Sequence, residues 1–223
     1  MLGRFLKPRW QHRDPEVRIR ALESMPVDKA DNREALAQCA HADEEARVRA
    51  AAAARLGDLQ ALNTLIEQDP AEEVRYHAAR QIERLLAGID EQAPEPDYRR
   101  RLIEQTDNQD VLYFIACRSP DAASREAAVA RLDEPDHLLE VALHGTDEGL
   151  RVAAARRLRD PDALKTLTRK GRDKRVLQTA RETLKSERSE QARREENARD
   201  IARLEDEARH LAGQTPDRLY HGR

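Results

Sequence analysis

The chain has 223 residues, of which 39% are hydrophobic and 37% charged, while aromatic residues account for only 3%. This length fits one ordinary domain or a short array of repeats. The net charge of −3 favours no class of partner, and two cysteines are too few for a disulfide framework.

The first twelve residues contain several large apolar side chains but lack the central apolar run of a signal peptide. These side chains could lie on a membrane surface or cover the open end of a repeat array. We favour the cover, and predict an N-terminal cap at residues 1–12, because Pro8 would interrupt a membrane-bound helix. The apolar side chains in question are Leu2, Phe5, Leu6 and Trp10.

No later stretch approaches the roughly 20 apolar residues of a membrane span. We therefore expect a cytoplasmic protein in a reducing environment.

A unit of 26 residues recurs through residues 13–185. The 50-residue gap in its register contains a degenerate copy that begins near Leu86, and a partial copy precedes the first full one. We count about seven units, the first partial and the fourth weak. The first apolar position of the five well-aligned units is held by Leu36, Leu62, Leu112, Leu138 and Leu164.

Each unit predicts two helices. Apolar residues three and four positions apart, such as Leu62, Leu65 and Ile66, form one stripe along the first helix. The second helix follows the pattern Val-Arg-x-x-Ala-Ala-x-x-Leu, in which a small residue would let neighbouring helices approach closely. That position is held by Ala52, Ala78, Ala128, Ala154 and Ala180.

Aspartates and prolines mark the predicted turns. We expect the first helices to be capped by the aspartates two positions before the repeated leucine, Asp110, Asp136 and Asp162. We expect the second helices to be capped by Asp121, Asp147 and Asp173. One such pair cannot bury its own apolar face, so the pairs must stack. The predicted fold is all-α, a right-handed α-solenoid of about seven short helix pairs.

The sequence resembles short bacterial HEAT-like repeats. The resemblance covers residues 10–185 and is clearest in residues 14–22, Asp-Pro-Glu-Val-Arg-Ile-Arg-Ala-Leu, and in residues 148–158. The variant leucine-rich repeat has a similar period and is the alternative. The opening at residues 8–15 also resembles proteobacterial proteins in which such repeats precede a coiled coil and a domain of unknown function, family 349. That likeness implies that this chain is part of a larger protein.

Beyond Leu184 the 26-residue pattern stops. Residues 186–213 are predicted to form a separate long charged helix, and residues 214–223 a frayed tail. Apolar residues at coiled-coil spacing extend over only two heptads, fewer than the three or four typical of a coiled coil. This helix could cap the last unit or begin a longer one. The apolar residues are Ile201, Leu204, Ala208 and Leu211.

The sequence has no motif of a known catalytic or metal-binding class. Its seven histidines are scattered, with no ligand spacing typical of a metal site. Cys39 takes an apolar position of the repeat and is interpreted as a small buried side chain, whereas Cys117 is expected to be partly exposed. We predict a protein that is not an enzyme and has no cofactor, metal or small-molecule substrate.

An arginine recurs at one position of the second helix, as in Arg49, Arg75 and Arg125. Such a row could bind carboxylates or phosphates. We favour a structural role, in which each arginine ties its unit to the next through an aspartate or a backbone carbonyl.

Charge is unevenly distributed along the chain. Residues 26–150 contain 14 Lys/Arg against 27 Asp/Glu, a net of −13, whereas residues 151–175 contain ten against three, a net of +7. Aromatic residues for base stacking are absent from the basic stretch, which argues against single-strand recognition. A solvated turn with no binding role is the alternative interpretation. The candidate binding residues are Arg151, Arg156, Arg169, Lys170, Arg172, Lys174 and Arg175.

Two functions follow from this charge distribution. The first is a protein–protein interaction scaffold whose acidic body favours a basic partner. The second is a HEAT-like protein that binds nucleic acid through residues 151–175. An accessory factor like the bilin lyases, which share short HEAT-like repeats, has no support beyond the repeat itself.

Overall fold

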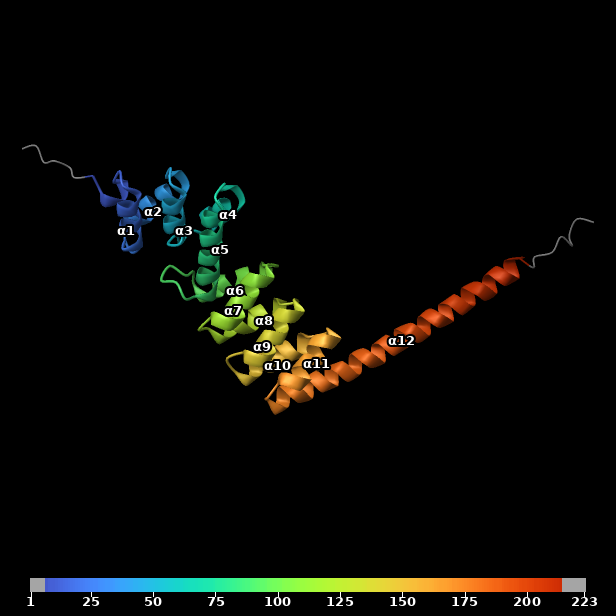
Figure 1. Cartoon of the computed structure of the whole chain (residues 1–223). Helices are drawn as coiled ribbons and strands as arrows, with labels where there is room; N and C mark the ends of the chain where they lie inside the picture. Colours follow the sequence, from blue (N-terminus) through green and yellow to red (C-terminus); the bar gives the residue numbers. More distant parts are fainter. Residues whose placement is uncertain (1–6, 214–223) are drawn as a thin grey trace, which may run out of the picture. The chain divides into compact units, whose positions relative to one another are not determined.

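The computed structural model describes residues 7–213 (Figure 1). The predicted cap residues Leu2, Phe5 and Leu6, and the predicted tail at 214–223, lie outside the described residues. Trp10 lies inside them and packs, half-buried, against the first part of the apolar core.

The described residues form one short 3₁₀ helix, η1 (Arg9–Gln11), and twelve α-helices, with no strand among them. None of these helices is both long and apolar enough to cross a membrane. The α-helices are α1 (Pro15–Glu23), α2 (Ala30–Ala42), α3 (Ala46–Ala53), α4 (Leu59–Gln68), α5 (Glu72–Ala87), α6 (Pro96–Gln105), α7 (Gln109–Arg118), α8 (Ala122–Arg131), α9 (Pro135–His144), α10 (Glu148–Arg157), α11 (Pro161–Lys170) and α12 (Lys174–Gly213).

The chain divides into two compact units. Unit 1 ends at His137 and unit 2 begins at Leu138, so the division falls within α9. In unit 1, α2 packs on α3, α4 on α5 and α7 on α8, as antiparallel neighbours joined by short turns (Figure 1). The second helices also pack on one another, α3 between α1 and α5.

The predicted core positions are buried. Each of the five repeated leucines is at most 2% exposed, and each of the five repeated alanines is fully buried. An alanine at this position leaves room for the next second helix to approach, as the sequence predicted. The all-α prediction is therefore confirmed for the described residues.

The degenerate fourth copy has one helix instead of two. Where its first helix was expected, α5 continues to Ala87 and ends at Gly88, which has a left-handed φ of 74°. Residues 88–95 then form no helix, and α6 supplies the second helix of the copy, with Arg99 at the repeated arginine position. Gly88 and the prolines at 94 and 96 explain this break, because neither residue type continues a helix.

In unit 2, α10 and α11 both pack on α12. Helix α12 is a single helix from Lys174 to Gly213, with no break at the predicted boundary between residues 185 and 186 (Figure 1). Its first part completes the last helix pair, and every side chain from 188 to 210 is exposed. The predicted separate charged helix is therefore the exposed continuation of the last repeat helix.

Half of the predicted caps are correct. Asp121, Asp147 and Asp173 accept hydrogen bonds from amides at the start of α8, α10 and α12. The predicted caps Asp110, Asp136 and Asp162 instead lie inside α7, α9 and α11. These helices begin two residues earlier than expected, and α7 and α11 are capped by Asn108 and Asp160.

Candidate functional site

The repeated arginines bind the turns between helices. Arg18, Arg49, Arg75 and Arg125 each donate from Nη1 to the backbone carbonyls five and six residues earlier. These carbonyls stand at or just after the end of the preceding helix, where they have no partner within it. Each arginine therefore supplies hydrogen bonds to backbone carbonyls of its own turn that the helix leaves unpaired.

Two of these arginines, and Arg151 at the same position of a later unit, also reach the next turn along the chain. The nitrogen–oxygen distances are 2.7 Å for Arg18–Asp43, 2.8 Å for Arg49–Asp69 and 2.9 Å for Arg151–Asp173. The pKa of Asp69 and that of Asp173 lie below their usual values, because each carboxylate accepts hydrogen bonds from its arginine. The structural interpretation is thus confirmed for Arg18, Arg49 and Arg151, whereas the bonds of Arg75 and Arg125 given above join groups of one turn.

The structure separates the seven basic residues that the sequence brought together. Arg151 belongs to the turn-binding row. Arg175 pairs with Glu148 at 3.3 Å. Because Glu148 begins α10, Arg156 lies eight residues further along that helix, about 12 Å away along its axis. Arg151 and Arg175 thus each have a carboxylate partner, and Arg156 lies in the last turn of α10.

The remaining four basic residues lie at a single turn, between α11 and α12. Arg169 and Lys170 end α11, Arg172 lies in the turn, and Lys174 begins α12. All four side chains are exposed, and none has an ion-pair partner among the described residues. We call these four residues the α11–α12 turn cluster.

A hollow of about 690 Å³ lies beside this cluster. Lys170 and Arg172 line it together with Arg151, but so do Glu140 and Asp173. These two carboxylates would repel an anion bound inside the hollow. The turn cluster borders the hollow through Lys170 and Arg172.

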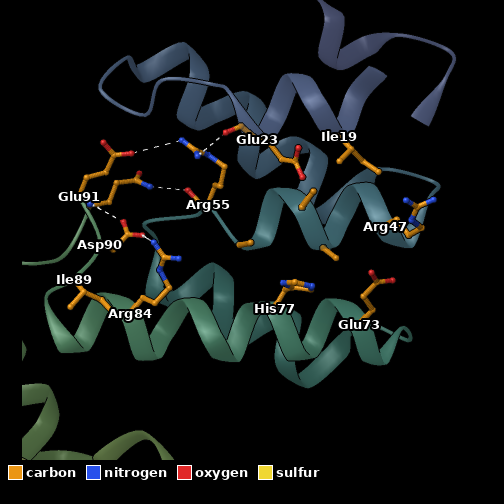
Figure 2. Close-up of a pocket in the computed structure, with 14 residues that line it drawn as sticks. Ile19, Glu23, Arg47, Arg55, Glu73, His77, Arg84, Ile89, Asp90 and Glu91 are labelled. Atoms are coloured by element: carbon orange, nitrogen blue, oxygen red, sulfur yellow. Dashed lines mark hydrogen bonds and ion pairs between the residues drawn. The ribbon is translucent and has the colours of Figure 1, made fainter. Parts of the chain in front are cut away.

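A groove that the sequence did not predict lies on the second helices of unit 1 (Figure 2). It has a volume of about 630 Å³, and α1, α3 and α5 all contribute to it. Ala50 and Ala51 of α3, and Ala54 directly after it, line the groove with small side chains. We call this site the second-helix groove.

The segment that replaces the missing helix closes one end of the groove. Residues 89–92 line this end, and Gln92 donates from Nε2 to the carbonyl of Arg55 at 2.8 Å. The buried Gln81 donates to the carbonyl of Leu56 at 3.0 Å and to Asp90 at 3.1 Å. The segment is therefore fastened to the turn between α3 and α4. Ile89 stands at this end with 44% of its surface exposed.

All three arginines of the groove have carboxylate partners. Arg55 also donates to the carbonyl of Glu23 at 2.9 Å (Figure 2) and to that of Met25 at 2.7 Å. The groove therefore presents no free guanidinium group. The ion pairs are Arg47–Glu16 at 2.8 Å, Arg84–Asp90 at 3.4 Å and Arg55–Glu91 at 3.8 Å.

Two carboxylates of the groove remain without a partner among the described side chains. Glu23 comes from α1 and Glu73 from α5, and both are exposed. Figure 2 shows Glu23 on one side of α3 and Glu73 on the other, where His77 projects from the same helix as Glu73. The groove therefore combines a floor of methyl groups with two unpaired negative charges.

The described residues hold no group of three or more His, Cys, Asp or Glu side chains that could bind a metal ion. Cys39 is buried, which raises the pKa of its thiol to about 11. Cys117 is partly exposed, as the sequence predicted. His137 stacks on Tyr113, and its Nε2 lies 3.6 Å from Asp110.

Comparison with models of known protein families gives no match for this sequence. Comparison with curated proteins gives none either. The second-helix groove and the α11–α12 turn cluster are therefore the two surfaces from which a function can be inferred.

Proposed function

We propose that this protein is a non-catalytic scaffold that binds a basic segment of a partner protein in the second-helix groove. We also propose that its helix pairs continue as a right-handed α-solenoid of about seven HEAT-like pairs, within a larger cytoplasmic protein. Stacked repeats present extended surfaces of this kind to partners.

The observation that carries the proposal is the balance of charge in the groove. Every arginine there is neutralised, while Glu23 and Glu73 are not. A lysine or arginine from a partner would complete the pairing, and a phosphate or acidic peptide would be repelled.

The floor of the groove favours a chain segment over a flat protein surface. Ala50, Ala51 and Ala54 project only methyl groups, so a partner backbone or apolar side chain can come close to α3. Ile19 and Ile89 add apolar surface to the groove. A segment with one or two basic residues and small or apolar neighbours fits these features.

A peptide selection on the full chain tests the proposal. Random peptides would be displayed on phage and selected on the immobilised protein, and their affinity would then be measured by fluorescence anisotropy. We expect the selected peptides to be enriched in Lys or Arg and to bind more weakly as salt increases.

Two double variants locate the binding. Glu23→Gln with Glu73→Gln should weaken binding by about tenfold, since each pair contributes up to about 1 kcal/mol at an exposed site. The control pair, Glu67→Gln with Glu104→Gln, removes the same charge from exposed, unpaired positions outside the groove. Equal effects of the two pairs, or selected peptides without basic residues, would reject the proposal.

A further inference from the structure

The α11–α12 turn cluster gathers four basic residues without carboxylate partners among the described residues at one turn of unit 2. Elsewhere in the unit, Lys165 pairs with Asp162 at 2.8 Å and Arg159 with Glu187 at 3.3 Å. In the exposed part of α12, Arg194 and Arg199 pair with glutamates one turn away. Arg156, Arg188 and Arg193 also lack such a partner in the described part of the chain, but they lie along α10 and α12, whereas the cluster brings four basic residues together at one turn.

The helix dipoles favour the positive charge of only two of the four residues in the cluster. Arg169 and Lys170 lie in the last turn of α11, where positive charge is favourable. Lys174 is the first residue of α12, where positive charge is unfavourable, and the cap Asp173 is the carboxylate beside it there. Mutual repulsion of four neighbouring cations adds to this cost. Stability of the unit therefore does not explain the cluster.

We propose that the α11–α12 turn cluster binds the phosphate backbone of double-stranded nucleic acid. This inference is independent of the second-helix groove. Four long, exposed cationic side chains at one turn suit a row of phosphates, since each needs only a point charge and hydrogen-bond acceptors.

The surrounding sequence determines which nucleic acid fits. Residues 138–213 contain no Phe, Tyr or Trp, so the described part of unit 2 has no platform on which an unpaired base could stack. Backbone contacts alone carry no information about sequence. The expected ligand is therefore a duplex, bound without sequence preference.

The number of cations sets the expected salt dependence. Each phosphate that is neutralised contributes about −0.9 to the slope of log K against log salt concentration for duplex DNA. Four contacts would give a slope of about −3 to −4, with an affinity in the weak range that is typical of non-specific binding.

The experiment measures the anisotropy of a fluorescent duplex DNA of about 20 bp as the full chain is added, between about 50 and 200 mM salt. The variant Lys170→Gln with Arg172→Gln should make the slope less negative by about 2. The matched control, Arg188→Gln with Arg193→Gln, removes the same charge from exposed, unpaired positions on α12 and should leave the slope unchanged. Circular dichroism checks that both variants remain helical.

Four outcomes would overturn the proposal. The first is no binding at the lowest salt concentration, where phosphate contacts are strongest. The second is an equal loss in the control variant, which would indicate a general effect of net charge. The third is tighter binding to single-stranded than to duplex DNA. The fourth is tighter, cluster-dependent binding to phosphatidylserine vesicles, which would assign the cluster to a membrane surface.

Discussion

The guanidinium of Arg49 binds the carboxylate of Asp69 through two hydrogen bonds, from Nε to Oδ2 at 2.8 Å and from Nη2 to Oδ1 at 3.0 Å. Arg49 lies on α3, and Asp69 lies between α4 and α5. The same guanidinium donates to the carbonyl of Asp43, and the same carboxylate accepts from the amide of Ala71. The pair therefore joins two successive turns while completing the hydrogen bonding of each.

Replacing Asp69 with asparagine should destabilise the protein by about 2–4 kcal/mol. The substitution leaves the Arg49 charge largely buried without its counter-ion, and breaking such a pair on one side is more costly than its net contribution. Urea denaturation followed by circular dichroism measures the free energy of unfolding.

Asp162→Asn is the matched control for this variant. Asp162 pairs with Lys165 across one exposed turn of α11, and pairs of that kind contribute at most about 0.5 kcal/mol. Similar losses in the two variants would show that Arg49–Asp69 does not join the turns.

The contribution of Asp69 should depend on pH. Its pKa is lowered because it accepts hydrogen bonds from Arg49, so the folded chain holds this carboxylate ionised at a pH where the unfolded chain protonates it. The stabilisation is complete above the unfolded pKa of about 3.9 and is lost as the pH falls through the lower folded value. The stability difference between the wild type and Asp69→Asn should therefore be constant from pH 7 to about pH 5 and shrink below about pH 4. A difference that is the same at pH 3 and pH 7 would contradict this origin.

The fold was predictable because its information is local and periodic. Leu62 and Ala78 recur with their counterparts at fixed intervals, and the burial of one apolar stripe per helix follows from that spacing alone. The role of Arg49 followed in the same way, since one residue per repeat is typical of a stacking contact. The starts of α7 and α11 were misplaced, because Asn108 and Asp160 are as good caps as Asp110 and Asp162.

The second-helix groove was not predictable in this way. Its closed end depends on Gln92 reaching Arg55, a contact across 37 residues within the copy that breaks the repeat. The charge of the groove depends on which of its arginines form ion pairs with carboxylates. One of these pairs, Arg55–Glu91, joins residues 36 positions apart in the sequence. The run of alanines at 50–54 was a visible signal, but a periodic pattern cannot tell a packed alanine from one that lines a groove. For the same reason, the sequence pattern did not distinguish Arg151, which is bound to a turn carbonyl and to Asp173, from the exposed Arg172.

Cys39 should be far less reactive than Cys117. Burial raises the pKa of the Cys39 thiol to about 11, so its thiolate fraction at pH 8 is about 100-fold lower than that of an unperturbed thiol. Labelling with iodoacetamide at pH 8, with peptide mass spectrometry to locate the adduct, should modify Cys117 first. Urea at the unfolding midpoint should remove the difference, and equal rates in the native protein would contradict the burial of Cys39.

Gly88→Ala should destabilise unit 1 by about 1–3 kcal/mol and loosen the closed end of the groove. Gly88 has a left-handed φ of 74°, which costs an alanine roughly 1–2 kcal/mol. A Cβ there would lie 2.7 Å from Nη2 of the buried Arg99, which donates from Nη1 to the carbonyl of Pro94. Gly149→Ala is the control, because Gly149 lies in the first turn of α10 without a positive φ, where alanine favours the helix. Urea denaturation should show a loss for Gly88→Ala and none for Gly149→Ala. Hydrogen exchange should then locate the loss in residues 88–95, and faster exchange confined to other segments would contradict the role assigned to this turn.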